Sequence, residues 1–134
     1  MNMGVWGSAA MELHTGYLYT HDGSDLDFFL QPKSKVSVRT LTRCLDAIVQ
    51  SEQNFHVRVD VELSLPSGYG ISLKELMDGK GTSVLGKGLH DVVLLRKSMV
   101  FDCLSAYSAN VASTVLAAHC DLKGPVSAQC TPAG

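Results

Sequence analysis

The sequence has few charged residues and no long hydrophobic run. Each absence argues against one class of protein. Only 18% of the 134 residues are charged, and the formal net charge is −2. This balance gives no electrostatic reason to expect a nucleic acid as a partner. No apolar stretch approaches the ~20 residues of a bilayer-spanning helix, and no secretory signal is visible at the N-terminus. We therefore expect a cytoplasmic protein that does not act in a membrane.

Cysteine and histidine are present, but neither forms a pattern that indicates chemistry. The cysteines (Cys44, Cys103, Cys120 and Cys130) are scattered, without a C-x-x-C or a zinc-site spacing. The five histidines suggest no ligand set or catalytic triad, and the G-x-S-x-G elbow of many hydrolases is absent. We therefore predict idle thiols and neither a zinc site nor a serine hydrolase.

The chain has the composition of a folded domain, with 46% hydrophobic residues. Its length suits one domain with an ordinary core. The C-terminal stretch from residue 123 contains Gly124, Pro125 and Pro132 and has no apolar periodicity. We expect residues 1–120 to form one domain and residues 121–134 to be a disordered tail.

Hydrophobic periodicity predicts a mixture of strands and helices. Alternation indicates strands over 24–30 and 55–65, and helical spacing indicates amphipathic helices over 38–49 and 99–120. Weaker signals predict shorter elements: strands over 4–6, 83–85 and 92–95, and helices over 9–13 and 72–78. These elements together predict an α+β fold, a mixed β-sheet with helices packed on one face.

Three aspartates occupy polar positions of the predicted strands. Asp25 and Asp27 are two residues apart, so their side chains would point the same way, and Asp60 lies on a later strand. Carboxylates crowded on one face repel unless a divalent cation lies among them, which favours a Mg²⁺ site. The alternative is a solvated sheet face, which is the better interpretation of Asp60 taken alone. Glu62 shares the face of Asp60 and is interpreted as a solvated neighbour.

A Gly7-Ser8 pair precedes the first predicted helix. Glycine lets the backbone approach a phosphate, serine adds a hydroxyl donor, and the helix N-terminus offers free N–H groups. Lys87, between two glycines, is a further candidate phosphate contact, although solvated charge is its plainer role. By themselves these are weak signals, and the aspartates downstream give them weight.

Four stretches, in this order, resemble a known family: "WGSAAMELHTGYLY", "GSDLDFFL", "VRVDVELSLPSGYGISLKEL" and "VLGKGLHDVVLL". The chain has a Gly-Ser pair, a helix, a strand with Asp-x-Asp, a second helix and a strand with a third aspartate. This order resembles the polymerase-beta-type nucleotidyltransferase superfamily. The more specific blocks are similar to one branch of it, the phosphoribosyl-dephospho-CoA transferases, also called malonate decarboxylase holo-acyl-carrier-protein synthases. The resemblance covers roughly residues 4–100.

The resemblance implies a nucleotidyltransferase-like fold and a specific reaction. The phosphoribosyl-dephospho-CoA group would pass from triphosphoribosyl-dephospho-CoA to a serine of the acyl carrier protein subunit of malonate decarboxylase, releasing diphosphate. By position, Asp25 and Asp27 would hold Mg²⁺, in a two-ion site, and Asp60 would complete the site and help deprotonate the serine. Gly7 and Ser8 would bind the triphosphate.

Two other functions remain compatible with the sequence. The same motifs serve small nucleotidyltransferases that use ATP, and a non-catalytic module could keep the fold and dock the carrier protein. The family generally carries an N-terminal domain before the Gly-Ser motif, whereas this chain begins six residues ahead of that motif. We therefore expect that domain to be absent, which favours the non-catalytic module, whereas the intact aspartates favour an enzyme.

Overall fold

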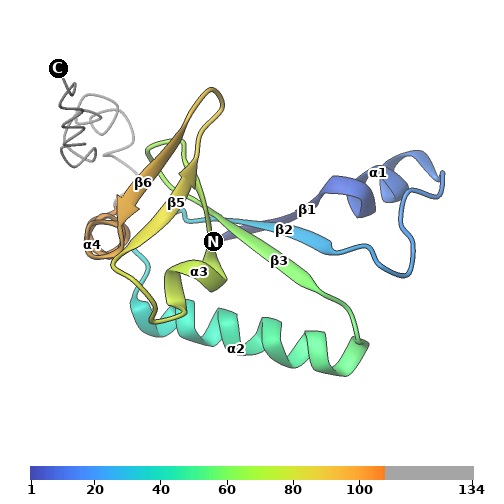
Figure 1. The fold of residues 1–134 in the computed structure, drawn as a ribbon, viewed down its shortest axis with the longest axis horizontal. Helices are drawn as coiled ribbons and strands as arrows, with labels where there is room; N and C mark the ends of the chain where they lie inside the picture. Colours follow the sequence, from blue (N-terminus) through green and yellow to red (C-terminus); the bar gives the residue numbers. More distant parts are fainter. Residues whose placement is uncertain (108–134) are drawn as a thin grey trace, which may run out of the picture.

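The computed structural model describes residues 1–107, which form a mixed sheet and four helices (Figure 1). The strands are β1 (Asn2–Trp6), β2 (Leu26–Gln31), β3 (Val59–Ser64), β4 (Gly70–Ser72), β5 (Ser83–Lys87) and β6 (Val92–Arg96). The helices are α1 (Gly7–Thr15), α2 (Val38–Phe55), α3 (Leu73–Met77) and α4 (Lys97–Ala106). The expected α+β class is confirmed.

The strands lie in the sheet in the order in which they occur along the chain, β1-β2-β3-β4-β5-β6. All neighbours are antiparallel except β2 and β3, which are parallel. Parallel neighbours need a crossover connection, and α2 provides it. This crossover brings the strand that contains Asp27 beside the strand that contains Asp60.

The core lies between the sheet and its helices. Figure 1 shows α2 and α3 side by side beneath the strands, while α1 extends from the end of β1. The alternating residues of β2 and β3 that face α2 are apolar, as the sequence predicts. The core consists of Leu30, Val36, Leu41, Val59, Val61, Leu63, Leu65, Tyr69, Ile71, Leu73, Leu76, Val84, Leu95, Val100 and Leu104.

The long helix α2 runs further than its apolar spacing predicts. It begins after Ser37, whose hydroxyl accepts from the Thr40 N–H at 3.2 Å, and it ends at Phe55, which is followed by His56 in a left-handed conformation with φ 53°. The strand predicted over 55–65 is therefore wrong at its start, because Phe55 is still helical and β3 begins at Val59. No helix within residues 1–107 is long and apolar enough to cross a membrane.

The C-terminal elements differ from the prediction in two ways. The strand predicted to be buried over 92–95 is the edge strand β6, where Leu95 is buried but Val92 and Leu94 are exposed. The helix predicted over 99–120 is α4, which begins at Lys97 and ends at Ala106. Tyr107, which was predicted to be helical, lies beyond the end of α4, and residues 108–134 lie outside the described residues.

Candidate functional site

A polar hollow of about 230 Å³ lies on the sheet face opposite α2. Its lining residues come from the first five strands and are mostly polar. They are Trp6, Asp27, Asp60, Val61, Glu62, Ser72 and Lys87. We call this cavity the polar hollow.

The two central carboxylates of the polar hollow come from neighbouring strands. Asp27 on β2 is the register partner of Asp60 on β3. Register partners point to the same face, and neighbouring strands are about 4.8 Å apart. Within residues 1–107, neither carboxylate has a hydrogen-bond or ion-pair partner. The arrangement therefore presents two free anionic oxygen donors side by side.

The N-terminus of α1 lies directly against one of these carboxylates. Gly7 begins α1 with φ 69°, and a Cβ placed on it would be 2.5 Å from Asp27 Oδ2. Glycine alone accepts this backbone without strain and leaves room for the carboxylate. The first N–H groups of an α-helix have no partner within the helix, and no side chain caps them in α1. Gly7 and Asp27 therefore lie in contact, whereas Ser8, the next residue of α1, is not among the residues that line the hollow, and its role in binding phosphate stays a prediction.

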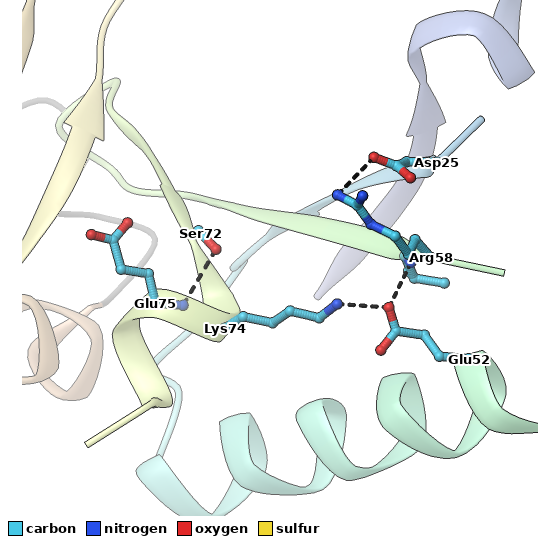
Figure 2. Close-up of polar contacts among 7 residues, drawn as sticks. Asp25, Glu52, Arg58, Ser72, Lys74 and Glu75 are labelled. Atoms are coloured by element: carbon cyan, nitrogen blue, oxygen red, sulfur yellow. Dashed lines mark hydrogen bonds and ion pairs between the residues drawn. The ribbon is translucent and has the colours of Figure 1, made fainter. Parts of the chain in front are cut away.

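Asp25, which was predicted to share a metal ion with Asp27, lies just before β2 and is paired with Arg58. Figure 2 shows its carboxylate paired with Arg58, which lies just before β3, at 3.1 Å. The backbones of the two segments are also joined, because the Leu26 N–H donates to the Arg58 carbonyl at 2.8 Å. Within the described residues no three His, Cys, Asp or Glu side chains lie together as a metal site. A site that includes Asp25 therefore needs this carboxylate to leave Arg58, and it stays a prediction.

A brace from α2 fixes the start of β3, one residue before Asp60. The Glu52 carboxylate accepts from the Val59 N–H and from the Lys74 ammonium of α3, both at 2.7 Å (Figure 2). The hydrogen bond from Lys74, followed by that from Val59, lowers the pKa of Glu52. The carboxylate is therefore held in its charged form, joining α2, α3 and β3 beneath the polar hollow.

The far rim of the hollow is formed by β4 and β5. Lys87 is exposed at the end of β5, opposite Gly70 of β4, and a Cβ on Gly70 would collide with the Glu62 carboxylate. The turn after Lys87 is held by a hydrogen bond from the Tyr69 hydroxyl to the Asp91 carboxylate at 2.9 Å. Glu62 therefore lies over β4, and Lys87 faces the same hollow from the next strand.

Sequence reasoning missed three residues of this site. Trp6 lines the hollow, and its only sequence signal is its place directly before Gly7. Ser72 caps α3, accepting from the Glu75 N–H at 3.3 Å, and it also lines the hollow. Glu52 was hidden on the polar side of α2, because its partners come from two other elements.

The donor set of the hollow suits a hard divalent cation. Carboxylate oxygens are the ligands that Mg²⁺ prefers, and Asp27 and Asp60 offer them without competing partners in the described residues. The Ser72 hydroxyl and the Lys87 ammonium line the same hollow, and α1 begins beside Asp27 at Gly7. These groups could contact an anion. Chemically, the hollow can hold a metal-bound phosphate ester.

The chain matches one known family over most of its length. Residues 1–98 match the family model described as the phosphoribosyl-dephospho-CoA transferase MdcG C-terminal domain. No solved structure matches the chain.

Three curated relatives carry the name phosphoribosyl-dephospho-CoA transferase. One from Xanthomonas euvesicatoria pv. vesicatoria is 33% identical over 102 residues, covering 76% of this chain and 46% of that protein. One from Xanthomonas axonopodis pv. citri is 33% identical over 105 residues, with the same coverage. One from Pseudomonas aeruginosa is 34% identical over 92 residues, covering 69% of this chain and 41% of that protein. The chain thus spans about half the length of the curated relatives it matches.

Proposed function

Because the chain belongs to the family of the phosphoribosyl-dephospho-CoA transferase MdcG C-terminal domain, we propose that it is a nucleotidyltransferase of the holo-acyl-carrier-protein synthase type. It transfers the phosphoribosyl-dephospho-CoA group from its triphosphate precursor to a serine of the malonate decarboxylase acyl carrier protein. The observation that carries this proposal is the register pairing of Asp27 with Asp60 beside the uncapped N-terminus of α1.

The reaction is a phosphoryl-type substitution that needs little covalent help. A bond forms between the serine oxygen of the carrier protein and the α-phosphorus of the precursor. The bond from this phosphorus to its bridging oxygen breaks, and diphosphate leaves with the electron pair. Asp60, exposed at the surface of the hollow, accepts the serine proton, while Asp27 would hold a cation that offsets the charge of the phosphate.

Mg²⁺ is the cofactor that this donor set favours, in a site of two ions. When bound, Mg²⁺ neutralises phosphate charge and stabilises the entering and leaving oxygens. Asp27 and Asp60 would hold it, and Asp25 would join them after leaving Arg58. That exchange is inexpensive, because the Arg58 side chain is 76% exposed and exposed ion pairs contribute little.

The remaining groups of the site bind the phosphates of the precursor. Gly7 and Ser8 lie at the start of α1, where N–H groups and the helix dipole favour an anion. Lys87 contributes a positive charge from the opposite rim. Preorganised donors of this kind stabilise charge that develops during the reaction.

The direct test is the intact mass of the carrier protein. It is incubated with this protein, Mg²⁺ and triphosphoribosyl-dephospho-CoA, and the reaction is repeated with Asp27→Asn. A matched control is Asp46→Asn, which removes an exposed carboxylate from α2, on the opposite side of the sheet. We expect a mass gain of one prosthetic group with the unmodified protein and the control, and none with Asp27→Asn.

Other outcomes point to other functions. No mass gain with the unmodified protein contradicts the proposal. A gain with ATP alone favours a different nucleotidyltransferase, and carrier binding without modification favours a docking module.

A further inference from the structure

The one tryptophan of the sequence stands half-exposed at the rim of the polar hollow. Trp6 keeps 48% of its surface accessible and lines the hollow with Asp27 and Asp60. Tryptophan is usually among the most buried residues on average, because its large ring gains much from removal from water. An exposed indole in a mostly polar site therefore provides an open aromatic surface.

The sheet register fixes where this ring stands. Trp6 on β1 is the partner of Asp27 on β2, which is the partner of Asp60 on β3. The three side chains therefore form a row across three strands, with neighbours about 4.8 Å apart at the backbone. The surface above Gly4, two residues earlier on the same face of β1, is filled by the Phe29 ring. The Trp6 side chain, two residues further along this face, is half-exposed and lines the hollow.

The residue after Trp6 begins the anion-binding end of α1. Gly7 and Ser8 follow the indole directly in sequence, and Asp27 lies against Gly7. A ligand held here would meet a flat aromatic surface and free N–H groups side by side. A planar base joined to phosphates through ribose has this combination of groups, since aromatic side chains stack on bases and helix N-termini bind phosphate.

We infer that the Trp6 indole stacks on the adenine ring of the donor and forms the base-binding subsite of the hollow. The inference rests on the proposed function, whose donor contains adenine. Stacking on one aromatic side chain contributes about 1–3 kcal/mol per base, which corresponds to roughly a 5- to 150-fold change in affinity. We expect Trp6→Ala to weaken adenine nucleotide binding about tenfold.

Because the chain has a single tryptophan, its fluorescence reports on this subsite directly. The protein is titrated with ATP and, separately, with inorganic triphosphate, which has the phosphates but no base. We expect ATP to quench the emission and triphosphate to leave it nearly unchanged. Equal effects of ATP and triphosphate, or no effect of ATP at saturating concentration, would overturn the inference.

Substitutions provide a second and independent measurement by calorimetry. Trp6→Phe should keep most of the affinity for ATP and Trp6→Ala should lose about tenfold, while triphosphate affinity stays the same in both. The control Phe55→Ala removes an aromatic side chain that is 75% exposed on the opposite side of the sheet, and it should bind ATP normally. Unchanged ATP affinity in Trp6→Ala would overturn the inference.

The inference and the proposed function can fail separately. Carrier modification with no dependence of the donor KM on Trp6 contradicts only the stacking. Base-dependent quenching without carrier modification supports the subsite and contradicts only the transferase.

Discussion

The two faces of β2 and β3 are built from alternate residues of the same two strands, and they differ in almost every physical respect. Toward α2 the strands present Leu26, Phe28, Leu30, Val59, Val61 and Leu63, all of which belong to the core or pack against it. On the opposite face they present Asp27, Asp60 and Glu62, which line the polar hollow, and Phe29, whose ring covers Gly4 of β1. One face is therefore expected to determine stability, and the other chemistry.

The apolar face is itself uneven. Leu63 and Ile71 are fully buried, but toward β1 the face opens into an apolar groove of about 670 Å³. The groove is lined by Met3, Leu26, Phe28, Leu30, Cys44, Ala47, Ile48, Ser51, Phe55, Val57, Val59 and Val61. The stabilising part of this face is thus the part beneath β3 and β4.

The largest expected effect is on the polar face. Asp60→Asn should lower carrier modification about 100- to 1,000-fold, as removal of one key electrostatic group does in other enzymes. Because Asp60 is exposed, the free energy of unfolding should change by less than about 0.5 kcal/mol. Mass spectrometry measures the first and urea unfolding the second. Loss of stability together with activity would contradict the division between the faces.

The next effect is on the apolar face. Leu63→Ala should lower the free energy of unfolding by about 3 kcal/mol, because a fully buried leucine leaves a cavity. Leu18→Ala is the matched control, since Leu18 is 82% exposed and should change stability by less than about 0.5 kcal/mol. Urea unfolding of the unmodified protein and the two variants measures both changes in the free energy of unfolding. Equal losses in the two variants would be evidence against a core that contains Leu63.

Two glycines at the ends of α1, Gly7 at its start and Gly16 directly after it, separate backbone strain from site chemistry. Gly7 and Gly16 have φ values of 69° and 73°, but only a Cβ on Gly7 would meet another group, Asp27. Each change to alanine should cost about 1 kcal/mol or more of stability through backbone strain. Only Gly7→Ala should also lose carrier modification. A similar loss of activity in Gly16→Ala would show that α1 acts through its overall stability instead.

A smaller effect concerns pH and the Glu52 brace. The pKa of Glu52 is lowered in the folded protein by Lys74 and the Val59 N–H. The brace therefore contributes its full stabilisation of the folded protein at pH values above the pKa of Glu52 in the unfolded chain, about 4.3. This contribution is lost as the pH falls through the lower pKa of Glu52 in the folded protein. Thermal unfolding is measured from pH 3 to 7. The Tm of Glu52→Gln should be lower than that of the unmodified protein at pH 7, and the difference should become small only at the acid end. Glu75→Gln, at an exposed position of α3, is the control, and a constant difference for Glu52→Gln would refute the brace.

The smallest effect tests whether Asp25 is a metal ligand. Arg58→Gln frees Asp25 and should change stability by less than about 0.5 kcal/mol, because the pair is exposed on the arginine side. It should lower the Mg²⁺ concentration for half-maximal carrier modification about twofold, while Asp25→Asn should raise it. If neither variant alters the Mg²⁺ dependence, Asp25 is not a ligand.

The sequence was sufficient to predict which residues share a face. Alternation places Leu26, Phe28 and Leu30 on one side of β2 and Asp27 on the other, because side chains of a strand point alternately. It could not predict that Asp27 would be opposite Asp60, because that register depends on where α2 ends. The end of α2 is set by His56 in a left-handed conformation, which the alternation beginning at Phe55 concealed.

Contacts between segments that are distant in sequence were beyond prediction. The direction of the Asp25 side chain depends on Arg58 from another segment, and the brace of Glu52 depends on Lys74. The same limitation applies to β6, whose apolar residues resemble a buried strand but lie at the sheet edge. Periodicity describes one element at a time, whereas these features belong to pairs of elements.

The agreement between strand order and chain order has a consequence for protein synthesis. Domains are made from the N-terminus onward, and each strand of this sheet finds its first partner in the strand made just before it. A nascent chain that has emerged as far as β3 already contains every residue of the Asp27–Asp60 pair, together with α1 and the crossover helix. Lys87 emerges later, so the ribosome releases the two rims of the hollow in sequence, the acidic one first.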